Sequence, residues 1–178
     1  MSYAVVFYLD PSKAAPLQAV IDELGSKNIA PFMHNIQLPP HITLAIYDEL
    51  ECQACEQKIA AFAKEVQGVD LLFSSIGIFD NTNPVVFAAP TLTHTLLVLH
   101  QRLHTLLEDE AHHPWEIYQP GLWVPHCSLA VEFPPQNLFK ALEICLQLEL
   151  PLQVPVSTVG VMQFEPLAPL YDYPLKQK

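Results

Sequence analysis

Two histidines in this sequence stand in nearly the same local setting. Segments 40–45 and 125–130 read Pro-His-Ile-Thr-Leu-Ala and Pro-His-Cys-Ser-Leu-Ala, so they share Pro, His, Leu and Ala, with Thr and Ser as hydroxyl equivalents. Displacement at phosphorus needs a base beside the attacking oxygen and an acid beside the leaving oxygen. Imidazole, with an unperturbed pKa of about 6.5, can fill either role near neutral pH. A lone motif would be read as a core histidine, but the repeat predicts that His41 and His126 act as an acid–base pair on a phosphodiester.

The hydroxyl of each motif is placed to help its histidine. Side chains alternate between the two faces of a strand, so Thr43 lies on the face of His41 and Ser128 on the face of His126. Each hydroxyl can donate a hydrogen bond to a non-bridging phosphate oxygen. The same alternation predicts that the closing alanine of each motif shares this face, while the aliphatic residues point into the core. Each motif therefore predicts half of a phosphate site.

Two aromatic residues precede the second motif. Tyr118 and Trp123 could form a wall on which a nucleotide base stacks, although core packing accounts equally well for Trp123. A protein that binds a nucleotide or a phosphorylated metabolite without turning it over is an alternative to an enzyme. The intact histidine and hydroxyl in both motifs favour the enzyme.

Two other groups of residues could hold a metal or a reactive thiol. His100, His104 and Glu108 lie four residues apart on a predicted helix, which would suit a metal-dependent hydrolase, but a hydrophilic stripe opposite the leucines also accounts for them. Cys52 and Cys55 form a lone C-x-x-C at a predicted helix start, without the further ligands of a zinc site. We therefore expect no metal and no other cofactor.

The segments that must position the two motifs alternate between strand and helix patterns. Runs of β-branched and aromatic residues predict strands at 3–9, within 37–47, over 71–88 with a turn at 80–84, at 126–133 and at 154–164. Apolar residues three or four positions apart predict helices around 17–24 and over 51–66, 91–110 and 135–147. Segment 111–125, rich in proline and aromatic residues, is predicted to be an ordered loop. No linker separates two domains, so we expect residues 1–178 to form a single mixed α and β domain.

Composition and charge limit the classes of ligand and the cellular compartment that we expect for this protein. Eight Lys and Arg against 19 Asp and Glu give a net charge of −11, and Arg102 is the only arginine, whereas proteins that grip long duplexes need clustered cations. The apolar run at 4–9 is far too short to span a bilayer. Four cysteines among 178 residues do not suggest a disulfide framework. We therefore expect a cytoplasmic monomer that binds neither long duplex nucleic acid nor a membrane.

The paired motifs resemble those of a known family, the two-histidine phosphoesterases. This family is marked by two His-x-Thr/Ser-hydrophobic motifs and includes bacterial proteins labelled 2′-5′ RNA ligases, cyclic phosphodiesterases and RNA-trimming exonucleases. Segments 77–79, 84–90 and 118–125 also resemble its bacterial ligase-like branch. The resemblance covers most of the chain, from residue 3 to residue 164.

The resemblance implies both a fold and an activity. The fold would be α+β and bilobal, with two pseudo-symmetric lobes whose antiparallel sheets are flanked by helices around a central groove lined by both motifs. The substrate would be a nucleotide-sized cyclic phosphate or an RNA 3′ end, with a 2′,3′-cyclic phosphate or 2′-5′ phosphodiester that is hydrolysed, or ligated in reverse, without a metal. Many ligase-like members carry an arginine where this chain has Val85. That departure argues against tight binding of RNA or of nucleotide phosphates.

Overall fold

The strand-like segments form an eight-stranded sheet within residues 1–164 and 166–176, which this computed structural model describes. In chain order the strands are β1 (Tyr3–Leu9), β2 (His41–Leu50), β3 (Asp70–Phe79), β4 (Val85–Pro90), β5 (Ala111–Pro114), β6 (Cys127–Ala130), β7 (Leu152–Gln163) and β8 (Ala168–Pro174). The pairings between these strands are antiparallel. The predicted α+β class, with an antiparallel sheet flanked by helices, is confirmed.

The long strand β7 joins the two halves of the sheet. Its first part, 152–155, pairs with β3, and the rest, 156–163, pairs with β1. The order in the sheet is therefore β5-β2-β1-β7-β3-β4-β6, with β8 also paired to β7. The two motif strands, β2 and β6, are far apart in this order but contact each other. The sheet thus curves until the two motifs meet.

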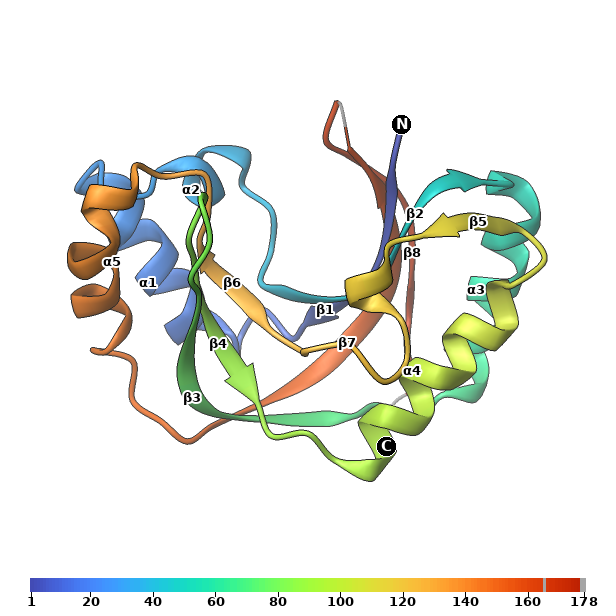
Figure 1. Ribbon diagram of the computed structural model, residues 1–178. Helices are drawn as coiled ribbons and strands as arrows, with labels where there is room; N and C mark the ends of the chain where they lie inside the picture. Colours follow the sequence, from blue (N-terminus) through green and yellow to red (C-terminus); the bar gives the residue numbers. More distant parts are fainter. Residues whose placement is uncertain (165, 177–178) are drawn as a thin grey trace.

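Helices cover the sheet in two groups that do not follow the order of the chain. The helices are α1 (Ala15–Ser26), α2 (Phe32–Ile36), α3 (Cys52–Glu65), α4 (His94–Leu107) and α5 (Leu138–Cys145), with short 3₁₀ turns η1 (Glu116–Tyr118) and η2 (Pro135–Asn137). Figure 1 shows α1, α2 and α5 on one side and α3 and α4 on the other, with the strands between them. Helix α1 precedes β2 in sequence but contacts β6, which comes from the second half of the chain.

The leucine periodicity of α4 explains why this segment is a helix. Leu96, Leu103 and Leu107 are fully buried along one stripe, and burying each side chain contributes about 1.5–3 kcal/mol. The helix begins after Thr93, whose Oγ1 accepts a hydrogen bond from the backbone N–H of Leu96 at 3.2 Å. No helix among the described residues is long and apolar enough to cross a membrane.

Two strands and two short helical segments were not predicted from the sequence. The segment 111–125 contains edge strand β5 as well as turn η1, and β8 and α2 lie in stretches for which no element was predicted. Both strands carry prolines, which are tolerated at a sheet edge but weaken any strand pattern in the sequence. Helix α2 has only five residues, too few to show a helical period.

Candidate active site

A β-bulge interrupts the first motif at its leucine. On the neighbouring strand β1, Val5 pairs with Ala45 and Val6 pairs with Thr43, so Leu44 has no partner in the ladder. A bulge of this kind reverses the alternation of side chains beyond it. Ala45 accordingly lies in the main core with Leu44, so the prediction that it shares the face of Thr43 was wrong.

The second motif carries the same bulge at the same place. On β4, Val86 pairs with Ala130 and Phe87 pairs with Ser128, so Leu129 is skipped. Ala130 also lies in the main core, and the predicted face was again wrong for the closing alanine. The two motifs are therefore alike in backbone shape as well as in sequence. Each presents only its histidine and its hydroxyl residue on the side away from the main core.

Both histidines are oriented by the same hydrogen bond. The Nδ1 atom of His41 lies 2.8 Å from the carbonyl oxygen of Pro39, and the Nδ1 atom of His126 lies 2.8 Å from the carbonyl oxygen of Val124. A carbonyl oxygen only accepts, so each Nδ1 carries the hydrogen and donates it. In the neutral ring the lone pair is then on Nε2, which has no hydrogen bond within the described part of the chain. Each Nε2 is thus available to a substrate.

The surroundings of the two imidazoles favour their neutral forms. Burial lowers the pKa of His41, and the nearby charge of His126 lowers it further, against the opposing effect of the hydrogen bond to Pro39. Burial also lowers the pKa of His126. A charge on His126 therefore makes His41 harder to protonate. Thr43 and Ser128 are half-buried beside them.

An aromatic ring on the next strand packs against His41. Tyr8 of β1 is the cross-strand partner of His41, and its ring lies edge-on at 6.0 Å between centroids. The ring lies across Gly160 of β7, where a Cβ atom would stand 2.7 Å from a Tyr8 ring carbon. Burial and the neighbouring Asp172 raise the pKa of Tyr8 to about 12, so its hydroxyl stays protonated.

The same arrangement recurs beside His126. Phe87 of β4, next to β6, lies 5.3 Å from the His126 ring, and Phe79 lies edge-on at 5.0 Å. The Phe87 ring covers Gly77 of β3, where a Cβ atom would stand only 2.4 Å from it. Sequence analysis missed these rings and Tyr8, because their signal is the pairing of an aromatic residue with a glycine across strands.

The two predicted stacking residues occupy different places. Trp123 is only 7% exposed, its Nε1 donates to the carbonyl oxygen of Thr43 at 2.9 Å, and its ring stacks on His100 at 4.0 Å with 3° between the planes. Tyr118 is partly buried, with its ring centroid 6.5 Å from that of His126. Since one face of Trp123 is occupied by His100, Tyr118 is the aromatic residue better placed to meet a substrate.

The predicted hydrophilic stripe on α4 is wrong for His100, which lies on the buried side of the helix. His100 is 1% exposed, and its Nε2 lies 2.8 Å from the carbonyl oxygen of Leu44 and 3.0 Å from that of Tyr118. His104 also directs Nε2 to the Leu44 carbonyl, at 3.3 Å, whereas Glu108 is exposed. Both histidines therefore form hydrogen bonds with the backbone of the first motif, at Leu44. In the part of the chain that the structure describes, no group of three His, Cys, Asp or Glu residues could hold a metal ion.

The cysteines of the C-x-x-C segment do not form a reactive pair. Helix α3 begins at Cys52, as predicted, and both thiols are free. Cys52 is exposed, whereas Cys55 is buried, and burial with the nearby Glu110 raises the pKa of the Cys55 thiol to about 12. A thiol with such a pKa stays protonated and is a poor nucleophile.

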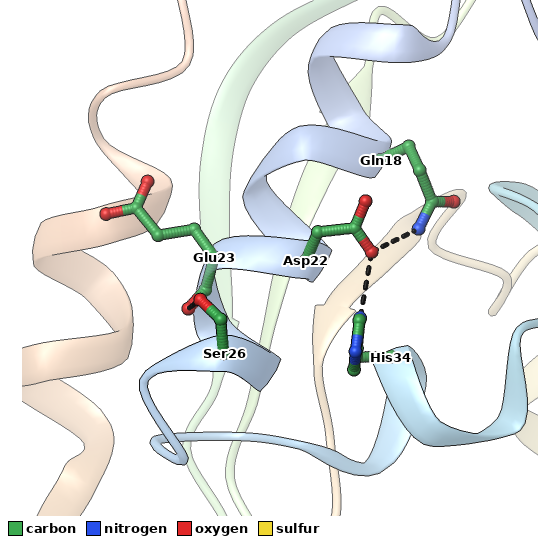
Figure 2. A network of polar contacts seen from close by, with 5 residues as sticks. All are labelled: Gln18, Asp22, Glu23, Ser26 and His34. Atoms are coloured by element: carbon green, nitrogen blue, oxygen red, sulfur yellow. Dashed lines mark hydrogen bonds and ion pairs between the residues drawn. The ribbon is translucent and has the colours of Figure 1, made fainter.

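The loop that orients His41 is anchored on helix α1. Figure 2 shows His34 of α2 directed at Asp22 of α1, with Nδ1 and Oδ1 2.9 Å apart, while Gln18 donates to the same oxygen at 3.1 Å. Gly25 permits this approach, because a Cβ atom there would stand 2.4 Å from the Cβ of His34. The chain then runs from α2 to Pro39, whose carbonyl holds the His41 ring.

Comparisons with known proteins agree with this architecture. Residues 9–166 match the model of the 2′-5′ RNA ligase superfamily, and no curated protein matches the sequence. Among solved structures, TT0787 of Thermus thermophilus matches with a TM-score of 0.63 and 18% identity over 100% of both chains. Apo LigT of E. coli matches with a TM-score of 0.61 and 15% identity over 99% of this chain and 98% of that one. Usb1 of Kluyveromyces marxianus matches with a TM-score of 0.54 and 15% identity over 98% of both chains. At such identities these likenesses show the fold alone.

Proposed function

The chain belongs to the 2′-5′ RNA ligase superfamily, as its two motifs predicted, and on this premise we propose a specific phosphoesterase reaction. The protein hydrolyses 2′,3′-cyclic phosphates or 2′-5′ phosphodiesters of nucleotides or RNA ends, or joins them in reverse, by acid–base catalysis with His41 and His126. The equivalence of the two imidazoles carries this proposal. Each is tied at Nδ1 to the carbonyl two residues earlier, and each leaves Nε2 free beside a hydroxyl.

The reaction needs only these groups and water. One neutral imidazole takes a proton from a water molecule at Nε2 as the water oxygen attacks phosphorus. The other imidazole, protonated at Nε2, gives its proton to the ribose oxygen as the phosphorus–oxygen bond breaks. The net change is the addition of one water molecule, and proton exchange with solvent returns both imidazoles to their starting states. In ligation a ribose hydroxyl attacks the cyclic phosphate in place of water, and the same ribose oxygen leaves with the proton of the acid.

The hydroxyls of Thr43 and Ser128 support this reaction at the phosphate. Each can donate a hydrogen bond to a non-bridging oxygen, where negative charge increases in the transition state. Neutral donors suit a singly charged phosphodiester. Tyr118, beside His126, is our candidate for contact with the nucleotide base.

Charge favours a small substrate. Among the residues that the structure describes, three Lys and Arg side chains are held in ion pairs, which join Lys27 to Glu23, Lys58 to Glu110 and Arg102 to Glu65. The chain as a whole carries −11. LigT has been solved with 3′-AMP, and Usb1 with uridine monophosphate. These ligands support a substrate of nucleotide size or an RNA 3′ end.

A substrate panel in the presence of EDTA tests the proposal. Purified protein is incubated with 2′,3′-cyclic mononucleotides, 2′-5′ dinucleotides and short RNAs ending in a cyclic phosphate, with 3′-5′ dinucleotides as the control. We expect turnover of at least one of the first three classes and none of the control. Saturable binding without turnover would instead support the non-catalytic alternative. Activity lost on chelation and restored by zinc or manganese would overturn the metal-independent mechanism.

A further inference from the structure

A buried histidine holds the first motif to the loop that leads into the second. The β-bulge takes Leu44 out of the β1–β2 ladder. The Nε2 atom of His100, on α4, lies 2.8 Å from the Leu44 carbonyl oxygen and 3.0 Å from the Tyr118 carbonyl oxygen. Both neighbours are acceptors, so Nε2 carries a hydrogen shared between them. One side chain thus joins β2 to turn η1.

Trp123 adds a second link between the same two segments. Its Nε1 donates to the carbonyl oxygen of Thr43 at 2.9 Å, and its ring stacks on His100 at 4.0 Å. Only Val124 and Pro125 separate Trp123 from His126, and the Val124 carbonyl orients the His126 ring. Through Trp123 and Val124, the backbone of Thr43 is therefore closely linked to the ring of His126.

We propose that His100 and Trp123 form a clasp that sets the separation between His41 and His126, and that both are positioning residues for the reaction. This inference rests on the proposed function. The clasp explains why a histidine stands on the buried stripe of α4, where a leucine would bury apolar surface without polar atoms that need partners. The N–H groups of His100 and Trp123 donate to the backbone of the first motif and of turn η1. A residue that served only for packing would not need these hydrogen bonds.

Three variants separate positioning from simple packing. His100→Leu removes the shared donor, His100→Gln keeps an N–H at the end of a side chain of similar reach, and Trp123→Phe keeps a stacking ring without Nε1. A shift of catalytic groups by about 1 Å can cost about 100-fold in rate. We expect His100→Leu and Trp123→Phe to lower kcat by about 10-fold or more with little change in KM, and His100→Gln to restore most of kcat. Val98→Ala, at an exposed position of the same helix, is the matched control.

A titration that needs no substrate tests the separation itself. The groups that face His41 are Tyr8 from β1 and His126 before β6, and Tyr8 stays protonated in the range of histidine titration. Replacing His126 with glutamine should raise the pKa of His41, measured by NMR, because a nearby positive charge is removed. In the His100→Leu background this rise should be smaller, since the coupling weakens with distance.

The outcomes distinguish the clasp from the proposed function. If the protein shows no turnover but the His41–His126 coupling weakens in His100→Leu, the clasp is supported and the proposed reaction is rejected. A His41–His126 coupling and a kcat that stay unchanged in His100→Leu would overturn the clasp. If His100→Leu does not fold, Trp123→Phe and His100→Gln decide the question by the same two readouts.

Discussion

The surroundings of His41 and His126, the histidines of the proposed reaction, contain features that a sequence motif does not display. Each ring is fixed by a hydrogen bond at Nδ1 and packed by an aromatic residue that lies across a glycine. Burial lowers the pKa of both histidines, most directly by disfavouring the charged ring. Without ligand, both rings therefore become neutral at a lower pH than a histidine in water does. A bound phosphodiester anion would favour the charged ring and raise both pKa values.

This difference predicts two separate pH profiles. Activity rises through the pKa of the base, which must be neutral, and falls through the pKa of the acid, which must be protonated. The kcat/KM profile reports the free enzyme, where both pKa values lie below about 6.5, so its maximum should also lie below about 6.5. The kcat maximum should lie at a higher pH. Initial rates measured from about pH 4.5 to pH 8.5 test this, and a kcat/KM maximum near pH 8 would contradict it.

Helix α4 shows what periodicity predicts and where it stops. The leucine spacing predicted the helix, but His100 lies on the buried stripe with Leu96, Leu103 and Leu107. From the sequence we expected His100 to lie on a polar face of the helix. The carbonyl groups that accept its hydrogen bond belong to distant segments, so the local pattern does not reveal them. The bulge at Leu44 supplies one carbonyl and turn η1 supplies the other. A buried polar group can be interpreted only when its distant partners are known.

His100 should also make the stability of the protein depend on pH. Burial and the neighbouring His104 lower its pKa to about 4, whereas the unfolded chain has a value of about 6.5. Between these values the unfolded state binds more protons, so acid favours unfolding and stability is lost as pH falls from 6.5 toward 4. The contribution of His100 between pH 7 and pH 5 is on the order of 2 kcal/mol.

Urea unfolding of the wild type and His100→Gln measures this contribution. Each protein is unfolded at about pH 7 and about pH 5, and the difference between the two losses of stability isolates His100 from the other histidines. We expect the wild type to lose more than the variant. Equal losses would show that the pKa of His100 is the same in the folded and the unfolded protein, which would contradict the lowered value.

Most of the strands and helices follow from sequence patterns, whereas the faces of the motifs do not. Alternation predicted that Thr43 lies beside His41, but it failed two residues further on because the bulge at Leu44 reverses the faces. The bulge depends on pairing with β1, which local residue types do not show. Edge strand β8 was missed for a similar reason, since its strand character comes from pairing with β7.

At the scale of the molecule, elements from the first half of the chain contact elements from the second half. Helix α1 contacts β6 in the second half, and His100 of α4 holds β2 in the first. Strand β7 spans both halves of the sheet. A curved sheet shared in this way brings β2 and β6 into contact, which is what a two-motif site requires. Neither half could form such a site alone.

The overall charge predicts which substrates are excluded. With −11 on the chain and one arginine, few phosphates can be neutralised, so little counterion release accompanies binding. We expect mononucleotides and RNA ends to be preferred over internal sites, with a Kd that changes little with salt. Fluorescence anisotropy with a labelled long RNA and a labelled mononucleotide at several salt concentrations measures this. Nanomolar, steeply salt-dependent binding of the long RNA would contradict it.

Steady-state turnover of His41→Ala, His126→Ala and the double variant, on the best substrate of the panel and in EDTA, tests the central claim most directly. Each single variant should lose about 10²–10⁴-fold in kcat, the usual contribution of a positioned acid or base, and the double variant should be little worse. Thr43→Ala and Ser128→Ala should lose less, and His94→Ala, at an exposed position, is the matched control. If His41→Ala keeps near-normal activity while His126→Ala is inactive, the paired mechanism is wrong and a one-histidine mechanism must replace it.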